Sequence, residues 1–581
     1  MLSLLCTKRR SHALFPRQLA MPAVAMLAAL IGGNSSALAK PEATHFDVVI
    51  STGPTHNMAL NNGIYGPTGN NAVLNIDDLT SALATGNIGV TTGNGAGGKT
   101  AGNLDLDAAL HWVSGNSLTL DAYRSVRLQR PVTDAGAGAL AIATHDGGKI
   151  GRLEFSGAGK IVFSNLANAL SINGQTFTLV GDIASLAAAI AAAPDGNYAL
   201  AASYDASTDK TYQQFSIPTV FEGNFEGLGN TISRVSIRGY GFFNMVDWGA
   251  SVSNLRLRDI TVDGRKLSGG SFGALASESF GALYGDAVSG RVMGGENPDQ
   301  AGGLTGGGNG SIEDCSSAAT VTAHISGPMY EGGLVGYFDG TITDSFATGD
   351  VTAKFGIMAA GGLVGQFQGA MRHSHATGNI RGLVKTGTLG GLIGLAIGRV
   401  ETSYATGNVK AASNMSSPMG GLIGAINGSI SESFATGEVG WENAREAAAG
   451  LAGASTGSIT NSYATGATAN NFGGATGLLG NYQFARVFVS SSYATGKVTS
   501  PEAGGFTLVT AKCPCFLNDY WDVTTSGTAD GIPNGNAPGV TGYTTEQLQA
   551  GLPHGFDPTI WAQDRRINKG LPYLIANPPP Q

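Results

Sequence analysis

A phrase that repeats every 29 or 30 residues constrains the fold of this chain more than any other feature. The tripeptide Ala-Thr-Gly recurs in steps of 29, 29, 30, 29 and 30 residues. Its first residues are Ala347, Ala376, Ala405, Ala435, Ala464 and Ala494. A second phrase, Gly-Leu-Val-Gly with small variations, keeps the same period from Gly333 to Gly453. A fixed period of this size is typical of stacked supersecondary units, none of which buries its apolar face alone.

Each repeat predicts two or three short strands. Runs rich in Val, Ile, Thr, Tyr and Phe alternate with turns rich in Gly, Asn and Asp, and no apolar pattern has helical spacing. Successive coils then pair as parallel strands about 4.8 Å apart, and crossovers between parallel strands are almost always right-handed. The sequence therefore predicts an all-β fold: a right-handed parallel β-helix with coils of 29–30 residues, a short helix between segments and an irregular C-terminal cap.

The constant register predicts two ladders of like residues on opposite faces of one strand. The first contains Ser345, Ser374, Ser403, Ser433, Ser462 and Ser492, with Cys315 one coil earlier. The second contains Phe346, His375, Tyr404, Phe434, Tyr463 and Tyr493. The small side chains are expected to face inward and the rings outward, although the reverse arrangement stays open at this stage.

An outward aromatic ladder is a candidate binding surface. Its rings could stack against sugars or contact partner proteins, and these six residues are the predicted binding site. The alternative is that like pairs on adjacent coils only stabilise the sheet.

The repeated phrases resemble the GLUG repeats of bacterial secreted, adhesin-like proteins, over about residues 300–500. Residues 221–232 resemble the coil that precedes such repeats, and residues 519–522 and 555–574 resemble the tail that closes them. The predicted organisation is a signal peptide (1–39), an N-terminal haemagglutinin-like β-helical segment (40–180), a helical linker (181–216), initial coils with a Gly-rich insertion (217–300), GLUG-type repeats (301–505) and a C-terminal cap (506–581).

The N-terminal segment lacks the repeat but keeps strand alternation. The stretch Asn116–Ala122 resembles filamentous-haemagglutinin-like exoproteins of Gram-negative bacteria, which implies an outer-membrane secretion partner. Asn61-Asn62-Gly63-Ile64 lacks the Pro of the secretion motif of that group. Ile183–Ala193 predicts a helix ended by Pro194, and residues 263–300 predict a degenerate coil with a surface loop. Thr544 and Gln547 have the spacing of a capping box.

Residues 1–39 predict a secretory signal peptide. A basic stretch precedes an apolar run from Leu19 to Ile31, and Ala37-Leu38-Ala39 forms a small-residue cleavage site before Lys40. The rest of the chain contains no other apolar run long enough to predict a transmembrane segment. With the resemblances above, this pattern predicts a protein secreted from, or exposed on, a Gram-negative cell.

Charge and catalytic motifs are sparse. The net charge is −8 and charged residues make up 13% of the chain, which argues against nucleic acid as a partner because nucleic acid requires a basic surface. No nucleophile elbow, phosphate loop or metal-binding motif stands out. No catalytic residue, metal site or cofactor is therefore expected.

Three small groups of residues have alternative interpretations. Asp314 and Asp344 lie one coil apart and could hold a cation or act on a glycan, or they could simply occupy a turn position. His373 and His375 could bind a metal, or His375 could fill the aromatic slot. Cys513 and Cys515 could form a metal or redox site, although free or oxidised thiols in a capping loop are favoured.

The sequence as a whole favours a non-catalytic adhesin or matrix protein that binds glycans or partner surfaces on a host or neighbouring cell. The alternative is a glycan-cleaving β-helix enzyme, a polysaccharide lyase or hydrolase, since this fold also hosts such enzymes. A cleft lined by several converging charged residues would favour the enzyme, and a smooth, regular flank would favour the adhesin.

Overall fold

The computed structural model describes most of the chain after residue 45. The described ranges are 46–93, 100–144, 151–296, 300–322, 330–355, 358–384, 387–411, 417–441, 448–470, 474–480, 487–509 and 515–580. The predicted signal peptide and Cys513 lie outside these ranges.

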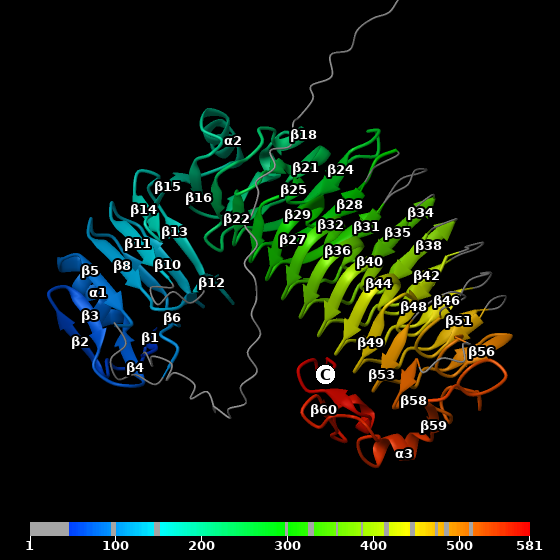
Figure 1. The fold of residues 1–581 in the computed structure, drawn as a ribbon. Helices are drawn as coiled ribbons and strands as arrows, with labels where there is room; N and C mark the ends of the chain where they lie inside the picture. Colours follow the sequence, from blue (N-terminus) through cyan, green and yellow to red (C-terminus); the bar gives the residue numbers. More distant parts are fainter. Residues whose placement is uncertain are drawn as a thin grey trace, which may run out of the picture. The chain divides into compact units, whose positions relative to one another are not determined.

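The described residues form a parallel β-solenoid with few short helices, which confirms the predicted fold class (Figure 1). One repeat shows the plan of a coil. It consists of β31 (Tyr330–Gly332), β32 (Val335–Thr343), β33 (Phe346–Ala347) and β34 (Val351–Phe355), and the next coil begins with β35 (Ala359–Gly361). Each strand pairs in parallel with its equivalents on the neighbouring coils, one repeat away.

The first strands of the coils form one continuous nine-stranded sheet. Besides β31 and β35 it contains β24 (Ser271–Gly273), β28 (Gln300–Gly302), β39 (Thr388–Gly390), β43 (Met419–Gly420), β47 (Ala448–Ala449), β52 (Gly474–Thr476) and β56 (Glu502–Gly504). The longest strands form a second face, and most of them contain a glycine with a left-handed φ, such as +129° at Gly369. They are β21 (Ser236–Val246), β29 (Thr305–Glu313), β32, β36 (Val364–Arg372), β40 (Ile393–Glu401) and β44 (Ile423–Ser431).

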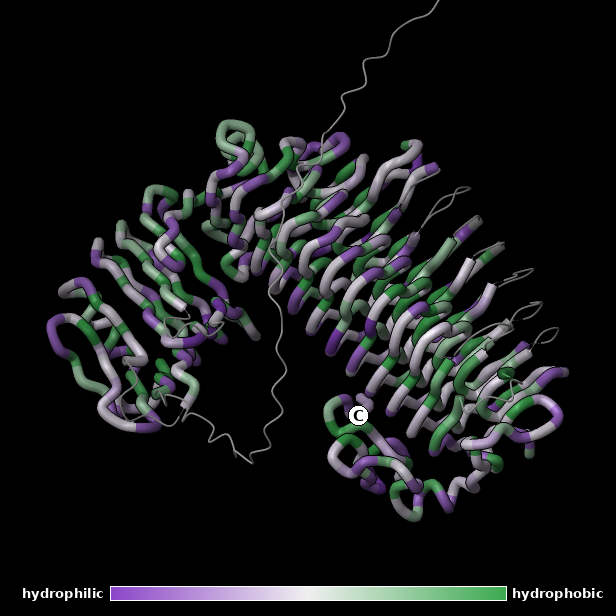
Figure 2. The backbone as a smooth tube through the Cα atoms, in the orientation of Figure 1, coloured by the Kyte–Doolittle hydropathy of each residue, from purple (hydrophilic) through white to green (hydrophobic). Residues whose placement is uncertain are grey.

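The repeated Gly-Leu-Val-Gly phrase builds the core. Its Leu and Val positions, such as Leu334 and Val335, are fully buried. Gly333 has no room for a side chain, because an added Cβ would lie 2.1 Å from the carbonyl oxygen of Gly362 on the next coil. Hydrophobic positions therefore recur from coil to coil along the tube in Figure 2, and the phrase is repeated because each coil meets the same neighbours.

The N-terminal segment is also a parallel solenoid, with its own core. One face contains β4 (Ala72–Asn75), β1 (Val48–Ser51), β6 (Leu104–Leu106), β9 (Val126–Leu128) and β12 (Leu153–Phe155). A second contains β7 (Leu110–Trp112), β10 (Pro131–Asp134) and β13 (Lys160–Phe163), and a third contains β3 (Ile64–Pro67), β5 (Ile88–Thr91), β8 (Ser117–Asp121), β11 (Ala139–Ala143) and β14 (Ala169–Ile172). Strand β2 (Met58–Asn61) forms a hairpin with β3.

A helix that the sequence analysis did not anticipate lies in this segment. It is α1 (Ile76–Thr85), capped by the side chain of Asn75, which accepts a hydrogen bond from the amide of Asp77 at 2.7 Å. Its apolar residues at helical spacing, Ile76, Leu79 and Leu83, are buried.

The N-terminal segment is joined directly to the repeats. The predicted helix forms as α2 (Ile183–Ala192), between β15 (Gln175–Val180) and β16 (Asn197–Leu200). Strand β16 pairs with β19 (Asn224–Glu226), and the amide of Ile161 donates to the carbonyl oxygen of Leu228 at 2.9 Å. Backbone pairing is therefore continuous across the junction.

The coil predicted at residues 263–300 forms over its described part, with residues 264–270 between strands β23 (Arg256–Asp263) and β24. This stretch contains β24, β25 (Ala276–Ser279), β26 (Ala282–Tyr284) and β27 (Ala287–Met293), all in register with the following coils. Several of its glycines make close contacts with the neighbouring coil. At Gly290, for example, an added Cβ would lie 2.0 Å from the carbonyl oxygen of Ile260.

The C-terminal residues fold back along the outside of the last coils. After β58 (Asp519–Asp522) and β59 (Val540–Tyr543) come α3 (Thr545–Gln549), β60 (Trp561–Ala562), a short 3-10 turn (Asn568–Gly570) and β61 (Tyr573–Leu574). The predicted capping box of Thr544 and Gln547 is confirmed. Within the described part of the chain, no helix is both long and apolar enough to cross a membrane.

Candidate functional site

The serine ladder is fully buried and is linked by hydrogen bonds along its length. Each hydroxyl donates to the carbonyl oxygen two residues earlier and accepts the amide hydrogen of the serine on the preceding coil. Ser403 Oγ, for example, donates to the Glu401 carbonyl oxygen at 2.8 Å and accepts from the Ser374 amide at 3.2 Å. Asp519 ends the ladder, because its Oδ1 accepts from the Ser492 amide at 3.0 Å.

The aromatic ladder is a stack of nearly parallel rings outside the solenoid core. Consecutive ring centroids are 5.0, 4.6, 4.9, 4.8 and 5.0 Å apart, and the interplanar angles are 2–7°. The stack contains Phe346, His375, Tyr404, Phe434, Tyr463 and Tyr493. The rings thus lie on the face predicted for them, opposite the serines.

The C-terminal residues cover half of this stack. Phe434, Tyr463 and Tyr493 are fully buried, in a separate apolar cluster with tail residues that include Phe556 and Trp561. The indole nitrogen of Trp561 also donates to Asn461 Oδ1 at 3.2 Å. These three rings therefore anchor the tail and are closed to any external ligand.

The other three rings, Phe346, His375 and Tyr404, are half-buried. The flat faces of inner rings are occupied by their neighbours in the stack, so that mainly ring edges reach solvent. Sugars stack on ring faces, which this geometry withholds. The arrangement favours the interpretation of the ladder as sheet stabilisation.

The position before each serine turns the corner of the coil with a left-handed backbone. Its φ values are +52° at Asp314, +50° at Asp344, +48° at His373 and +49° at Thr402. Asp and Asn tolerate this conformation better than most residues. A turn position therefore explains the backbone conformation of Asp314 and Asp344. It does not explain the location of their side chains.

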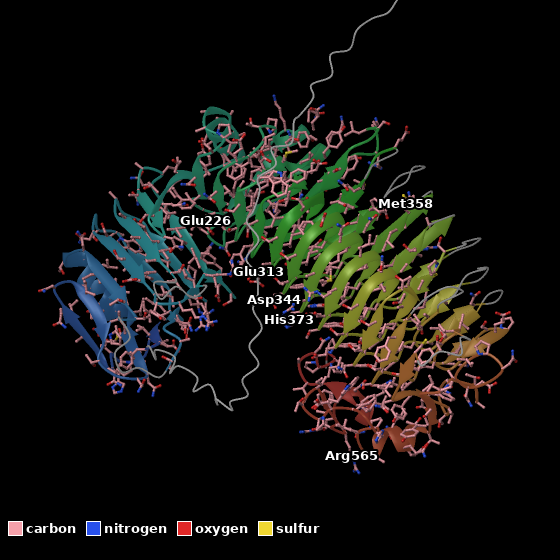
Figure 3. The ribbon with its side chains drawn as sticks, viewed as in Figure 1. Glu226, Glu313, Asp344, Met358, His373 and Arg565 are labelled. Atoms are coloured by element: carbon pink, nitrogen blue, oxygen red, sulfur yellow. The ribbon has the colours of Figure 1, made fainter. Side chains whose placement is uncertain are left out.

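Asp314 and Asp344 line a polar cleft of about 620 Å³. Tyr284 and Glu313, at the ends of β26 and β29, lie on the same side as these aspartates. The N-terminal segment supplies the opposite side, with Arg124, Arg127, Arg152 and Glu154 among its residues. In Figure 3, Glu313, Asp344 and His373 follow one another along one edge of successive coils. The convergence of so many charged side chains is unusual in a chain with so few.

Arg152 links the two sides of the cleft. Its guanidinium forms an ion pair with Glu313, 161 residues away, and lies 4.2 Å from the centroid of the Tyr284 ring. Arg127 is held by a bidentate pair with Asp105, at 2.6 and 2.9 Å. The two arginines are thus fixed in position while their side chains stay 31% and 40% exposed.

The Asp314 carboxyl lies close to other carboxylates of the cleft. Burial raises the pKa of Asp314, and the nearby carboxylate of Asp344 raises it further. Asp344 Oδ1 lies 3.5 Å from Nδ1 of His373. The cleft can accept hydrogen bonds at its carboxylates, donate them from its arginines and present the Tyr284 ring, which suits a ligand rich in hydroxyl groups.

The other residues that the sequence singled out as possible metal or redox sites are the histidines and the cysteines. His375 is stacked between Phe346 and Tyr404, and burial lowers its pKa. Among the described residues, no group of three or more His, Cys, Asp and Glu side chains could hold a metal ion. Cys315 is a buried free thiol, and Cys515 is disulfide-bonded.

Sequence reasoning missed the N-terminal half of the cleft. Arg152 and Glu154 are distant in sequence from Glu313, and nothing in a single sequence pairs them. On the repeat side, Tyr284 and Glu313 occupy a strand position that is Ser253 one coil before Tyr284 and Thr343 one coil after Glu313. The same position is Arg372 and Glu401 in later coils, so it did not single out the cleft.

No family model matches the chain, and no curated protein matches it. The GLUG and haemagglutinin resemblances therefore remain resemblances of motifs. One similar solved structure is named IgA1 Protease, at 21% identity and a TM-score of 0.29, covering 60% of this chain and 24% of that one. The chain thus spans about a quarter of the length of that protein.

A second similar structure comes from Bacteroides ovatus and is named as a candidate immunoglobulin A1 protease. Its identity is 14% and its TM-score is 0.29, with coverage of 69% of this chain and 93% of that one. At these scores the likeness carries no argument about function.

Proposed function

We propose that this protein is exported and binds glycans in the polar cleft between its N-terminal segment and its first repeats, without cleaving them. The observation that carries the proposal is the convergence of Arg152, Tyr284, Glu313, Asp314 and Asp344 on one cleft. Because the rest of the chain is poor in charge, a cluster of charged residues at this one place calls for a specific explanation. Ligand binding supplies that explanation, because binding sites bring a few polar groups together in one cleft.

A neutral, hydroxyl-rich ligand matches the cleft best. Carboxylates such as Asp344 accept hydrogen bonds from hydroxyl groups, and the guanidinium groups donate to hydroxyl or ring oxygens. Glu313 and Asp105 already neutralise Arg152 and Arg127. The other carboxylates of the cleft would therefore repel a strongly anionic polysaccharide. They would not repel a neutral glycan.

Export is supported by the sequence of residues 1–39, with its basic stretch, apolar run and small-residue cleavage site. The protein would then act outside a Gram-negative cell, on glycans or proteins of a host or neighbouring cell, after export through an outer-membrane partner. Intact-mass analysis of extracellular protein tests this point. The expected mature chain begins at Lys40, and retention of residues 1–30 would contradict export by a cleaved signal.

A second candidate function is glycan hydrolysis in the same cleft. It is favoured by the two carboxyl groups of Asp314 and Asp344, which line the same cleft from adjacent coils, where burial and then the charge of Asp344 raise the pKa of Asp314. A carboxylic acid next to a carboxylate is the arrangement that glycosidases use. A cleft with several converging charged residues is also the feature expected of an enzyme. We rank this function second because Asp314 has a structural role in turning the coil, and because Arg127 and Arg152 are already paired with carboxylates.

A glycan array with mature protein tests binding, followed by calorimetric titration of the strongest ligands. Asp314→Asn keeps the left-handed corner, because Asn tolerates that conformation, and removes the charge. We expect this variant to bind at least tenfold more weakly, and the distant, exposed control Lys410→Ala to bind as the parent does. Equal binding by all three proteins would contradict the proposal.

The same preparations distinguish binding from cleavage. Incubation with the bound glycans should release no new reducing or unsaturated ends. If ends are released, and if Asp314→Asn and Asp344→Asn both abolish the release, the protein is an enzyme and the non-catalytic proposal is wrong.

A further inference from the structure

One tryptophan of the described chain is strongly exposed. The Trp248 side chain is 66% exposed, whereas Trp112, Trp521 and Trp561 are buried. Its indole stacks on Phe280 of the next coil, with centroids 5.8 Å apart and an interplanar angle of 22°. A large aromatic ring that is exposed and held against a second ring is suited to stack on the apolar face of a ligand.

The aromatic pair is fixed in position by the coil corner that carries it. The amide of Asp247 donates to the Phe221 carbonyl oxygen at 2.8 Å, and that of Phe280 donates to the Val246 carbonyl oxygen at 2.8 Å. Gly249, next to Trp248, has a φ of +80°, and an added Cβ there would meet nothing within 4 Å. The indole is thus held on a firm backbone beside open space.

This pair lies at the coil corner that precedes β26, and the cleft begins at the other end of that strand. Phe280 comes just before β26, and Tyr284 of the cleft ends that strand. Strand β22 (Ser251–Ser253) pairs with β26 in parallel, which places Trp248 at the same end of the neighbouring strand. The separation from Phe280 to Tyr284 is four residues, which is at most about 13 Å of chain.

The surface between the Trp248–Phe280 pair and the cleft carries no long side chain among the residues that the strand pairing places there. Its outward residues are Ser251, Ala282 and Ser311, all with short, half-buried side chains. An extended ligand could therefore lie across it without displacing a side chain. The span is too long for one sugar ring and suits an oligosaccharide.

We infer that Trp248 and Phe280 form a distal stacking subsite for a neutral oligosaccharide whose other end occupies the polar cleft. The inference rests on the proposed function of the cleft. The apolar face of a sugar ring packs on the indole, while hydroxyl groups of the same chain reach Asp314 and Asp344. The structure thereby assigns the ligand a minimum length.

Titration with chito-oligosaccharides, from N-acetylglucosamine to the hexasaccharide, tests the subsite. Trp248→Ala should weaken hexasaccharide binding about tenfold or more and leave disaccharide binding unchanged, whereas Asp314→Asn should weaken both. Trp248→Phe should restore most of the affinity. Leu517→Ala, which removes another side chain that is 53% exposed, serves as the control and should change nothing.

Tryptophan fluorescence gives a second readout that a merely structural role would not change. The hexasaccharide should protect the fluorescence of the parent protein from quenching by acrylamide, and this protection should be lost in Trp248→Phe. If Trp248→Ala binds the hexasaccharide like the parent, or weakens all lengths equally, the subsite inference is wrong. Dependence of binding on Asp314 would still leave the proposed function standing. Failure of the hexasaccharide to bind also overturns the inference, and the glycan array then decides the function of the cleft separately.

Discussion

The hydroxyl of Tyr493 donates a hydrogen bond to the carbonyl oxygen of Pro572 at 2.6 Å, although the two residues are 79 positions apart. Tyr493 belongs to the aromatic stack of the repeats, and Pro572 belongs to the C-terminal residues that cover it. The same hydroxyl accepts from Asn568 Nδ2 at 2.8 Å. The stack thus serves as the attachment surface for the tail.

The same substitution in two adjacent rings should have different effects on stability. Tyr493→Phe removes the bonds to Pro572 and Asn568, and should lower the free energy of unfolding by about 0.5–1.5 kcal/mol. The Tyr463 hydroxyl is buried without a hydrogen-bond partner among the described residues, so Tyr463→Phe should be neutral or stabilising. Urea denaturation of both variants, with limited proteolysis of the tail, checks this. Equal losses would show that the hydroxyl of Tyr493 does not hold the tail.

The two faces of the ladder strand should differ sharply in their tolerance of substitution. Ser403→Lys would place a charge in the buried serine ladder, where no partner compensates for its lost hydration, and should prevent cooperative folding of the neighbouring coils. Tyr404→Ser removes a half-buried ring from the outer stack and should cost far less. Circular dichroism melts compare them. A larger loss for Tyr404→Ser would mean that the faces are reversed.

Thr402 should be a site of local strain. Its φ of +49° is unfavourable for a β-branched residue, and the same corner position is Asn461 two coils later. Thr402→Asn should raise the free energy of unfolding by about 1 kcal/mol. Thr341→Asn, at an exposed strand position, is the matched control and should bring no gain. Loss of stability in Thr402→Asn would contradict the strain argument.

Stability should fall with rising pH because of Glu226. Burial raises its pKa to about 8 from the ordinary 4.5, against hydrogen bonds from the Leu228 amide and the Asn254 side chain. Below pH 4.5 both the folded and the unfolded chain hold the proton on Glu226, so its contribution to the free energy of unfolding is fully present. Between pH 4.5 and 8 only the folded chain holds it, and stability falls by up to about 1.4 kcal/mol per pH unit.

Thermal melts from pH 4.5 to 8.5 measure this slope. Glu226→Gln keeps an acceptor for both hydrogen bonds and has no proton to lose, so its slope should be smaller. Some slope should remain, because burial also raises the pKa of Asp286 and Asp519. An unchanged slope in Glu226→Gln would show that this carboxyl does not titrate as proposed.

The repeats could be predicted from the sequence because every coil meets copies of itself. The period determines which residues pair, so Ser403 and Tyr404 could be assigned to opposite faces. The parallel solenoid is confirmed, and its right-handedness stays a prediction. Helix α1 was missed because strand alternation dominates residues 45–180, although Asn75 and the spacing of Ile76, Leu79 and Leu83 carried the signal.

The covering of the ladder and the cleft could not be predicted, since both depend on contacts between non-repeating segments. No period relates Trp561 to Tyr493, or Arg152 to Glu313. Such contacts depend on side-chain fit between parts of the chain that meet only once. For the same reason, the candidate site lies at a junction rather than within the regular repeats.

A crystal structure of the mature protein with the tightest-binding glycan from the array tests the central claim most directly. The account predicts sugar density in the cleft, within hydrogen-bond distance of Asp314, Asp344 or Arg152, with an intact glycosidic chain. Density only along the exposed edges of Phe346, His375 and Tyr404, with an empty cleft, would contradict it.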